Sequence, residues 1–454
     1  MNQAEDVEVI LGRERRYKFH SGTLARSSTL FADMLTEPNA AKLNSRARNA
    51  GIKVRWMIEL TRLPCSQYPA GCLELVDLAP TGERADGRSG MVVNENGRIP
   101  KALKAYAHYE AVLYAFYGKE LVIDDENMSA ALSDCFQLLV VSDYLGCTGL
   151  VRKPIEVALF KHGQGLFRAI QGAPCRWVEL AYRIRSELIF KECMIHLVGN
   201  WKKIKENKSV DILLHTVPGL RDLIEKYHRV LVAKCKQLED GFTSYYPPRM
   251  RLPVDDLPIK REAYAKDILI WMALSFFRQW IAQHLNMEEG RHSQDCGYGL
   301  YKQIGTAGES YMDKSIINQF HTHFPMTKKA MNVLENHLLE IKECMKSIVN
   351  QHAILKSNCQ LDVNRFPVKY LTCTAFQRKD YPWLNAEVPA KVVPAKRDYK
   401  PGGNEIARQT LDTARMFQDQ SLSVEASEER EEDFEESDTE DVPTTSRTKR
   451  TRIG

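Results

Sequence analysis

Residues 6–35 read DVEVILGRERRYKFHSGTLARSSTLFADML, and this stretch decides the fold at the start of the chain. Apolar residues alternate with others through VEVIL, the polar turn GRERR follows, and YKF forms a second short segment. A period of two is typical of a half-buried strand. The two segments therefore predict a strand hairpin.

A helix is predicted directly after this hairpin. Ser27 or Ser28 can accept a hydrogen bond from the first turn of that helix, because serine is a favoured capping residue. The residues that follow place an apolar face at helical spacing. This face consists of Leu30, Phe31, Met34 and Leu35.

Outward from this stretch, further strands are predicted at residues 52–60 and 73–78, with an exposed loop at 79–100. Helices are predicted at 105–118 and 128–146, each ending at a glycine, because glycine accepts the left-handed backbone that ends a helix. The combination predicts an α+β N-terminal domain, a small sheet flanked by helices.

Beyond residue 150 the pattern is helical almost throughout. Residues 176–200 have apolar residues at helix-like intervals, and the most apolar segment, 268–277, is interpreted as a buried helix. It has about half the length needed to cross a bilayer. The Pro-rich segment 245–258 and the glycine-rich segment 295–308 are predicted to be loops.

The last helical region carries an apolar stripe at alternating steps of three and four residues. The stripe consists of Met331, Leu334, Leu338, Ile341, Met345 and Ile348. Two interpretations are open: the stripe packs within its own domain, or it is a seam for a partner.

Composition limits the classes of function. The 454 residues are 44% apolar and 27% charged, which suits a folded protein of two or three domains. A net charge of +4 does not indicate a nucleic-acid-binding surface over the whole chain. Eleven scattered cysteines without a CxxC pair, and no secretory signal, favour free thiols in the nucleus or cytoplasm.

The apolar periodicity ends after Trp383, and residues 386–454 are predicted to be a disordered tail. An acidic run at 425–441 precedes a basic end. Candidate phosphorylation sites in the acidic run are Ser437 and Thr439. Candidate nuclear-targeting residues are Arg447, Lys449, Arg450 and Arg452, unless these cations only offset the acidic run.

The order of elements at the start resembles a BTB/POZ domain. The residues that carry the resemblance are Asp6, Tyr17, His20, Leu24, Ser27 or Ser28, and Phe31. The resemblance resumes at YEAVLYAFYGKEL and FQLLVVSDYLGCTGL, and it is greatest to fungal BTB-domain proteins with a helical C-terminal part. It implies a BTB/POZ-like domain at 5–160 with an insertion near 36–104, followed by a helical domain at 161–385.

The chain also differs from the BTB/POZ pattern at two places. The family often has a basic residue directly after the histidine, whereas this chain has Ser21, so the charged pocket of that family is not expected here. Only five residues precede Asp6, which is too few for the extra strand that some members exchange between subunits.

Chemical sites are not predicted. His20 has no nucleophile or carboxylate that the pattern places beside it, so it is interpreted as a buried histidine bonded to backbone. His321 and His323 would face the same way on an extended segment, but no further metal ligand has suitable spacing. Gly297, Gly299 and Gly305 do not form a nucleotide-binding loop. We expect no catalytic residue, metal or cofactor.

The leading hypothesis is therefore a non-enzymatic protein-interaction protein, an adaptor or scaffold. Its candidate interaction surface is Leu24, Leu30, Phe31 and Met34. The resemblance implies a transcriptional or ubiquitin-ligase partner, such as a cullin, and the helix face predicts a weak homodimer. The alternative is a nuclear protein linked to nucleic acid, for which a basic patch with interleaved aromatic residues would be needed. No membrane association is expected.

Overall fold

The structure is a computed structural model of the chain. It describes residues 5–12, 14–85, 103–123, 127–207, 214–247, 268–287 and 289–386. The described residues all belong to one compact unit, residues 1–388. The predicted tail, with its acidic run and basic end, lies outside the described residues.

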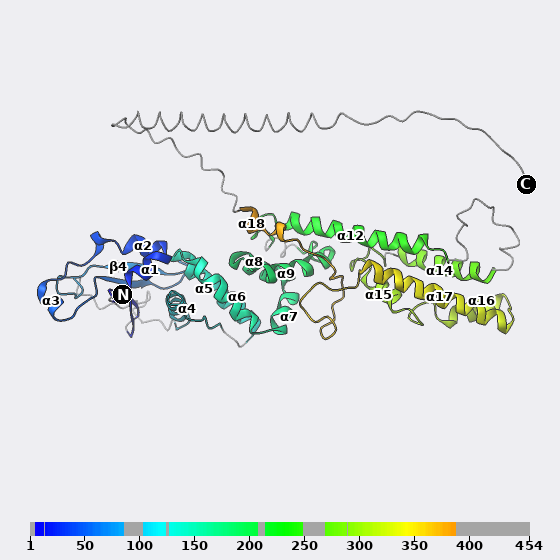
Figure 1. Cartoon of the computed structure of the whole chain (residues 1–454), viewed down its shortest axis with the longest axis horizontal. Helices are drawn as coiled ribbons and strands as arrows, with labels where there is room; N and C mark the ends of the chain where they lie inside the picture. The colour runs from blue at the N-terminus through cyan, green and yellow to red at the C-terminus, as the bar shows by residue number, and fades with distance from the viewer. Residues whose placement is uncertain are drawn as a thin grey trace, which may run out of the picture. The chain divides into compact units, whose positions relative to one another are not determined.

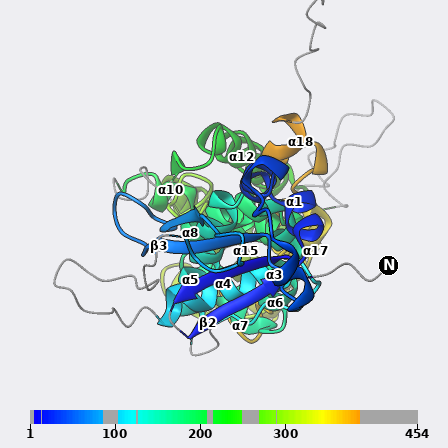
Figure 2. The same ribbon diagram turned by 90° about the vertical axis from the view of Figure 1, so that its left-hand side faces the viewer.

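A four-stranded mixed sheet forms near the N-terminus, as the sequence predicts (Figure 2). Its strands are β1 (Val7–Gly12), β2 (Arg15–Phe19), β3 (Trp56–Arg62) and β4 (Cys72–Val76), in the order β2-β1-β3-β4. The predicted hairpin is confirmed, because β1 and β2 are antiparallel with Val9 opposite Tyr17. Strand β3 runs parallel to β1 and antiparallel to β4.

The segment interpreted as an insertion near 36–104 is half of this sheet. It supplies β3 and β4, and it also contains a 3-10 turn (Glu37–Asn39) and the short helix α3 (Ser45–Asn49). Strands β3 and β4 overlap the strands predicted at 52–60 and 73–78. Ile58 and Leu60 of β3 are fully buried, so the N-terminal core depends on this segment.

The two edges of the sheet differ. At the β4 edge, Leu73 donates its backbone N–H to the Tyr144 hydroxyl at 2.8 Å. At the β2 edge, Arg16 and Lys18 are exposed, and Arg16 forms an ion pair with Glu8 of β1 at 3.0 Å. One edge is thus capped by a tyrosine, and the other carries cations.

Helices pack against the sheet and against each other to close the N-terminal core (Figure 2). They are α1 (Ser21–Ser27), α2 (Thr29–Met34), α4 (Leu103–Ala115), α5 (Met128–Tyr144) and α6 (Thr148–Phe160). Ser28 caps α2, because its hydroxyl accepts from the Phe31 N–H at 3.1 Å. The same hydroxyl donates to the Leu145 carbonyl after α5. Ser28 therefore joins the two ends of the N-terminal region.

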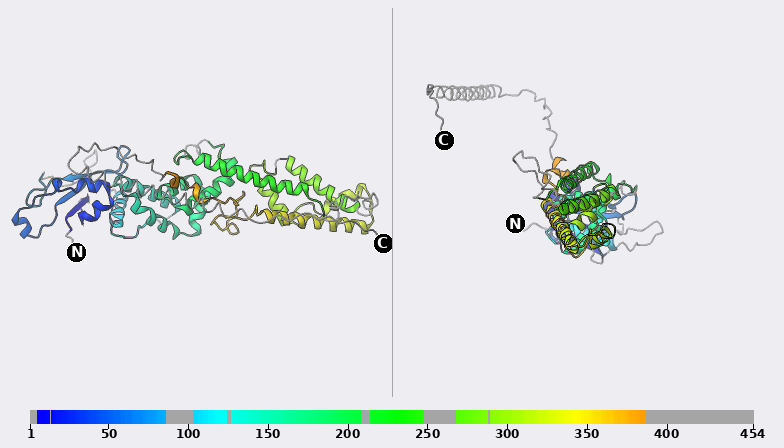
Figure 3. Two further views of the ribbon diagram at one scale, coloured as in Figure 1. Left: turned by 45° about the horizontal axis from the view of Figure 1, so that its top comes forward. Right: turned by 90° about the vertical axis from the view of Figure 1, so that its right-hand side faces the viewer.

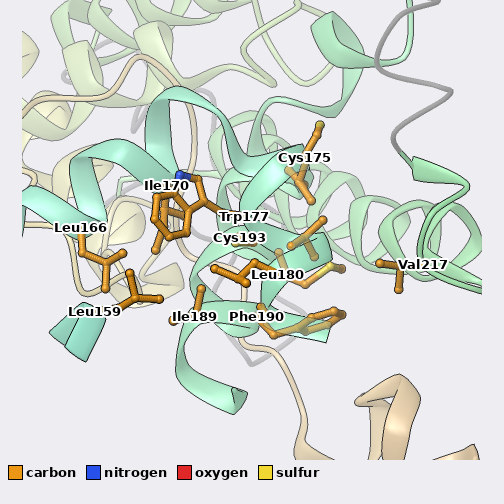
Figure 4. Close-up of a cluster of buried hydrophobic side chains, with 14 of the residues drawn as sticks. Leu159, Leu166, Ile170, Cys175, Trp177, Leu180, Ile189, Phe190, Cys193 and Val217 are labelled. Carbon is orange, nitrogen blue, oxygen red and sulfur yellow. The ribbon is translucent and has the colours of Figure 1, made fainter. Parts of the chain in front are cut away.

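Four helices come next in the described segment 127–207. They are α7 (Gln164–Gly172), α8 (Pro174–Ile184), α9 (Glu187–Gly199) and α10 (Trp201–Ile204). The single helix expected at 176–200 is two, because Arg185 has a left-handed backbone (φ 56°) and Ser186 caps α9 through the Ile189 N–H. Figure 4 shows the resulting core, in which Trp177 and Phe190 are buried. Helices α6 and α8 pack against each other, so contacts cross the domain boundary that was predicted at residue 160.

A second group of helices follows, and they lie side by side in Figures 1 and 3. They are α12 (Leu220–Ser244), α14 (Ile268–Asn286), α15 (Tyr298–Thr306), α16 (Lys314–His323) and α17 (Lys328–His352). The apolar stripe of α17 packs against α12, α14 and α15, so it is a face within this group and not a free seam. Among the described residues, no helix is both long enough and apolar enough to cross a membrane.

Helix α15 lies where a glycine-rich loop was predicted. Gly297 has φ 85° at the residue before the helix, and Gly305 lies inside it. A side chain at Gly305 would come within 3.0 Å of Leu355 and 3.3 Å of Val349, so this glycine lets α15 approach α17 closely. The prediction is wrong because these glycines mark a helix start and a close contact, and not a loop.

The last described segment returns to α9. It includes a 3-10 turn (Arg378–Asp380) and α18 (Pro382–Ala386). The Glu192 carboxylate of α9 accepts from the backbone N–H groups of Gln360 and Leu361 at 2.7 and 3.0 Å. Aromatic side chains of the segment then pack around Phe190 of α9.

A buried carboxylate joins α12 to the loop before α15. Glu239 accepts from the Arg291 backbone N–H at 2.6 Å and from the Tyr301 hydroxyl at 2.7 Å, and it forms an ion pair with the Arg291 guanidinium. Lys202 of α10 holds the same loop through the carbonyls of Arg291 and Ser293. The buried Glu239 carboxylate is thus satisfied by partners from different elements, and Arg291 and Lys202 are half-buried beside it.

We predict that Ser28→Ala lowers the free energy of unfolding by about 2 kcal/mol, because it removes a helix cap and leaves a buried carbonyl with less support. Ser27→Ala is the matched control, since Ser27 is exposed and caps nothing. Chemical denaturation of both variants checks this. Equal losses would contradict the assignment of the cap to Ser28.

We also predict that Glu239→Gln lowers the free energy of unfolding by about 2 kcal/mol, because the amide places a donor against the Arg291 guanidinium. The adjacent Asp240→Asn is the control, because Asp240 is exposed. Thermal and denaturant unfolding of both variants measure the difference. An unchanged Glu239→Gln protein would show that the buried pair contributes nothing to stability.

Candidate partner-binding groove

The structure places the predicted interaction surface largely in the core. Leu24 and Phe31 are fully buried, while Leu30 and Met34 are half-buried against the same cluster. Leu24 and Phe31 cannot contact a partner while this region stays folded. This apolar helix face closes the N-terminal core.

His20 is half-buried, and its ring does not bond to backbone as expected. Its Nδ1 lies 3.1 Å from the Tyr117 hydroxyl, which also accepts the His20 backbone N–H at 2.9 Å. Tyr117 in turn stacks on Phe19. The ring therefore belongs to an aromatic cluster beside β2.

His321 and His323 lie on helix α16, so the extended segment assumed for them is wrong. Residues two apart on a helix point to different sides. His321 Nδ1 accepts from the Met326 backbone N–H at 2.9 Å. Across the described ranges no three His, Cys, Asp or Glu side chains are grouped as metal ligands.

The other predicted site residues cannot be placed. Ser437, Thr439, Arg447, Lys449, Arg450 and Arg452 all lie outside the described residues. Their roles in phosphorylation and nuclear targeting stay predictions.

A groove of about 740 Å³ lies between the end of α12, the start of α14 and one side of α17. Ile270 of α14 and Ile341 of α17 are buried in its floor. Tyr245 and Pro247, just after α12, form one wall, and Leu339 of α17 is 39% exposed at the other. A large apolar side chain exposed beside such a hollow is typical of a binding surface.

The rim of the groove is acidic. Glu340 and Glu343 both line it, and their side chains are mostly exposed. His337 Nδ1 lies 3.4 Å from Glu340, and Lys346 lies 3.6 Å from Glu343. Exposed pairs of this kind are weak, so both carboxylates can exchange these partners for a ligand.

Part of this groove can be anticipated from the sequence. The stripe on α17 predicted which side of the helix is buried, and the groove lies on the adjacent side. Tyr245 lies in a segment interpreted only as a loop, and its place depends on Arg278, whose guanidinium donates to the Tyr245 carbonyl at 3.4 Å. Arg278 and Tyr245 are 33 residues apart in the sequence. A contact over such a separation leaves no local pattern from which it could be predicted.

The thiols of the chain fall into two groups. Burial raises the pKa of the Cys193 and Cys235 thiols, which keeps them protonated and unreactive. Cys344, in contrast, lines the groove and is half-buried, and Cys65 is exposed. Cys344 is therefore a chemical handle inside the groove.

Comparison with protein families identifies one region. A family model of the fungal FF domain matches residues 247–352, which is well under half of the chain. This region contains α14 to α17 and nearly all residues that line the groove. FF domains are generally protein-interaction modules. The comparisons with curated proteins and with solved structures each gave no match.

This finding corrects the predicted BTB/POZ membership. The family comparison matches an FF-domain model, within the part of the chain that was predicted only as helical, and it finds no BTB/POZ match. The residues that suggested the resemblance have local roles in this structure. Ser28 caps a helix, Leu24 and Phe31 fill a core, and Asp6 accepts from Ser21. A hairpin followed by a capped helix requires such residues, whatever its family.

We predict that a thiol reagent modifies Cys344 and Cys65 of the folded protein at least about a hundredfold faster than Cys193 and Cys235, which react only after opening. Mass spectrometry of peptides from a timed reaction measures each rate. Denatured protein, in which all four should react alike, is the control. A Cys344 as slow as Cys235 would show that the groove is closed to solvent.

Proposed function

We propose that this protein is a non-enzymatic protein-interaction protein, and that the groove beside α17 binds an extended or helical segment of a partner. The observation that carries the proposal is the position of the groove within the region similar to the FF domain. The proposal contains no chemical step.

The chemistry of the groove selects one kind of partner segment. Its apolar floor, with Ile270 and Ile341, favours a segment with apolar side chains. Its acidic rim, with Glu340 and Glu343, favours lysine or arginine beside them, because complementary charge gives orientation and selectivity. We therefore propose a partner segment that combines apolar and basic residues.

The proposal leaves out several earlier expectations. A cullin or ubiquitin-ligase partner followed from the BTB/POZ resemblance, and it is not retained. The predicted weak homodimer loses its support, because Leu24 and Phe31 are core residues. Work in the nucleus or cytoplasm stays part of the proposal, and so does the absence of a cofactor.

Selection from a random displayed peptide library tests the proposal on the full chain. We expect enriched peptides that contain apolar residues flanked by lysine or arginine. The double variant Glu340→Lys with Glu343→Lys should weaken binding of such a peptide by about tenfold or more, because two attractive charges become repulsive. A peptide with its basic residues changed to glutamate should then regain affinity for the variant.

The matched control for the groove is Val230→Asp, which changes an exposed apolar residue on the outer side of α12. It should leave peptide binding unchanged, whereas Leu339→Asp should abolish it. Enrichment of acidic peptides, or binding that Leu339→Asp does not affect, would overturn the proposal. Circular dichroism of each variant confirms that the helices remain folded.

A further inference from the structure

A second charged surface lies in the N-terminal region, on the segment 41–55 that contains α3. We name this segment the basic loop. Its base is closed by the Ala41 N–H, which donates to the Arg55 carbonyl at 2.8 Å. The Asn44 N–H donates to the Pro80 carbonyl at 3.0 Å, which ties the loop to the segment after β4. In Figure 1, α3 projects beyond the strands.

The basic loop has an inner and an outer side. Leu43, Ala47 and Val54 are buried, so three of its residues anchor it to the body of the domain. The Ile52 N–H donates to the Ala47 carbonyl at 3.1 Å, which folds the loop back on itself after α3. Because these contacts fix the backbone, the outward side chains are held on a shaped surface.

The outer side is cationic and uncompensated. Residues 38–58 contain no acidic residue. Lys42, Arg46, Arg48 and Lys53 are exposed, and within the described part of the chain none of them forms an ion pair. Only Arg55 is paired, since its guanidinium donates to both carboxylate oxygens of Glu37, at 3.1 and 2.5 Å. Like charges so close together repel each other, and an anionic partner would relieve that repulsion.

A cavity of about 320 Å³ adjoins the basic loop. The residues that define its character are Leu43, Ile52, Lys53, Arg55, His20 and Asp6. The Asp6 carboxylate is already bonded to the Ser21 N–H and hydroxyl, each at 2.7 Å. The cavity is therefore lined by two apolar side chains, Leu43 and Ile52, next to two cations, Lys53 and Arg55. Its acidic residue, Asp6, already bonds to Ser21.

We propose that the basic loop and this cavity bind an acidic segment of a partner protein, with one apolar side chain of that segment in the cavity. The carboxylates of the segment contact Lys42, Arg46, Arg48 and Lys53. The apolar lining favours a peptide over nucleic acid, because a phosphate backbone has no group to bury against Leu43 and Ile52. This surface and the α17 groove have opposite charge, so they select different partner segments.

Fluorescence anisotropy of the full chain with a labelled peptide, Glu-Glu-Asp-Leu-Glu-Glu, tests the proposal. The double variant Arg46→Glu with Arg48→Glu should weaken binding by about tenfold or more, since it reverses two exposed charges. Lys328→Glu with Lys329→Glu is the matched control: it makes the same charge change at the exposed first turn of α17. This control should bind like the unchanged protein.

Three results would overturn the proposal. Equal weakening by both double variants would show that only net charge matters. Unchanged binding of a peptide with serine in place of leucine would remove the role of the cavity. Tighter binding of a short nucleic-acid duplex, lost in the Arg46 and Arg48 variant and steeply dependent on salt, would assign the surface to nucleic acid instead. Unfolding curves of all variants exclude a general loss of structure.

Discussion

The buried carboxylate of Glu239 is the constraint on which the helical part of the structure depends. It lies near the end of α12, a helix that packs on α9 toward the N-terminal part and on α14 and α17 toward the C-terminal part. Because Glu239 bonds to Arg291 and Tyr301, it sets how α12 meets the FF-like region. Removing a charged partner from such a site is costly, since the remaining charge stays partly buried.

The groove depends on this arrangement. Its wall at Tyr245 begins immediately after α12 ends, before the region similar to the FF domain, while its floor belongs to α14 and α17. The FF-like region alone would therefore lack Tyr245, which forms part of one wall of its groove. A family boundary and a binding surface need not coincide, because a boundary follows sequence similarity and a surface follows packing.

The sequence predicted the elements whose cause is local. The alternation of apolar residues predicted the hairpin, and a serine at the start of α2 predicted its cap. The spacing of apolar residues in α17 predicted its buried stripe. It failed where the cause lies far away in the chain. Strand β3 pairs with β1 across more than thirty intervening residues, Gly305 is small because α17 is close, and the groove joins three helices. The BTB/POZ resemblance failed for a related reason, since it rested on a local order of residues that several folds can share.

The open edge of the sheet has a consequence for the behaviour of many copies at once. An unpaired strand is a template on which an identical strand can add, and repeated addition leads to aggregates. If the β2 strands of two molecules met, Lys18 of each would approach the Arg16 and Lys18 of the other, and the cations would repel. At the opposite edge, the Tyr144 hydroxyl already occupies a backbone donor of β4. Both edges of the folded sheet are thus protected against the addition of strands from other molecules.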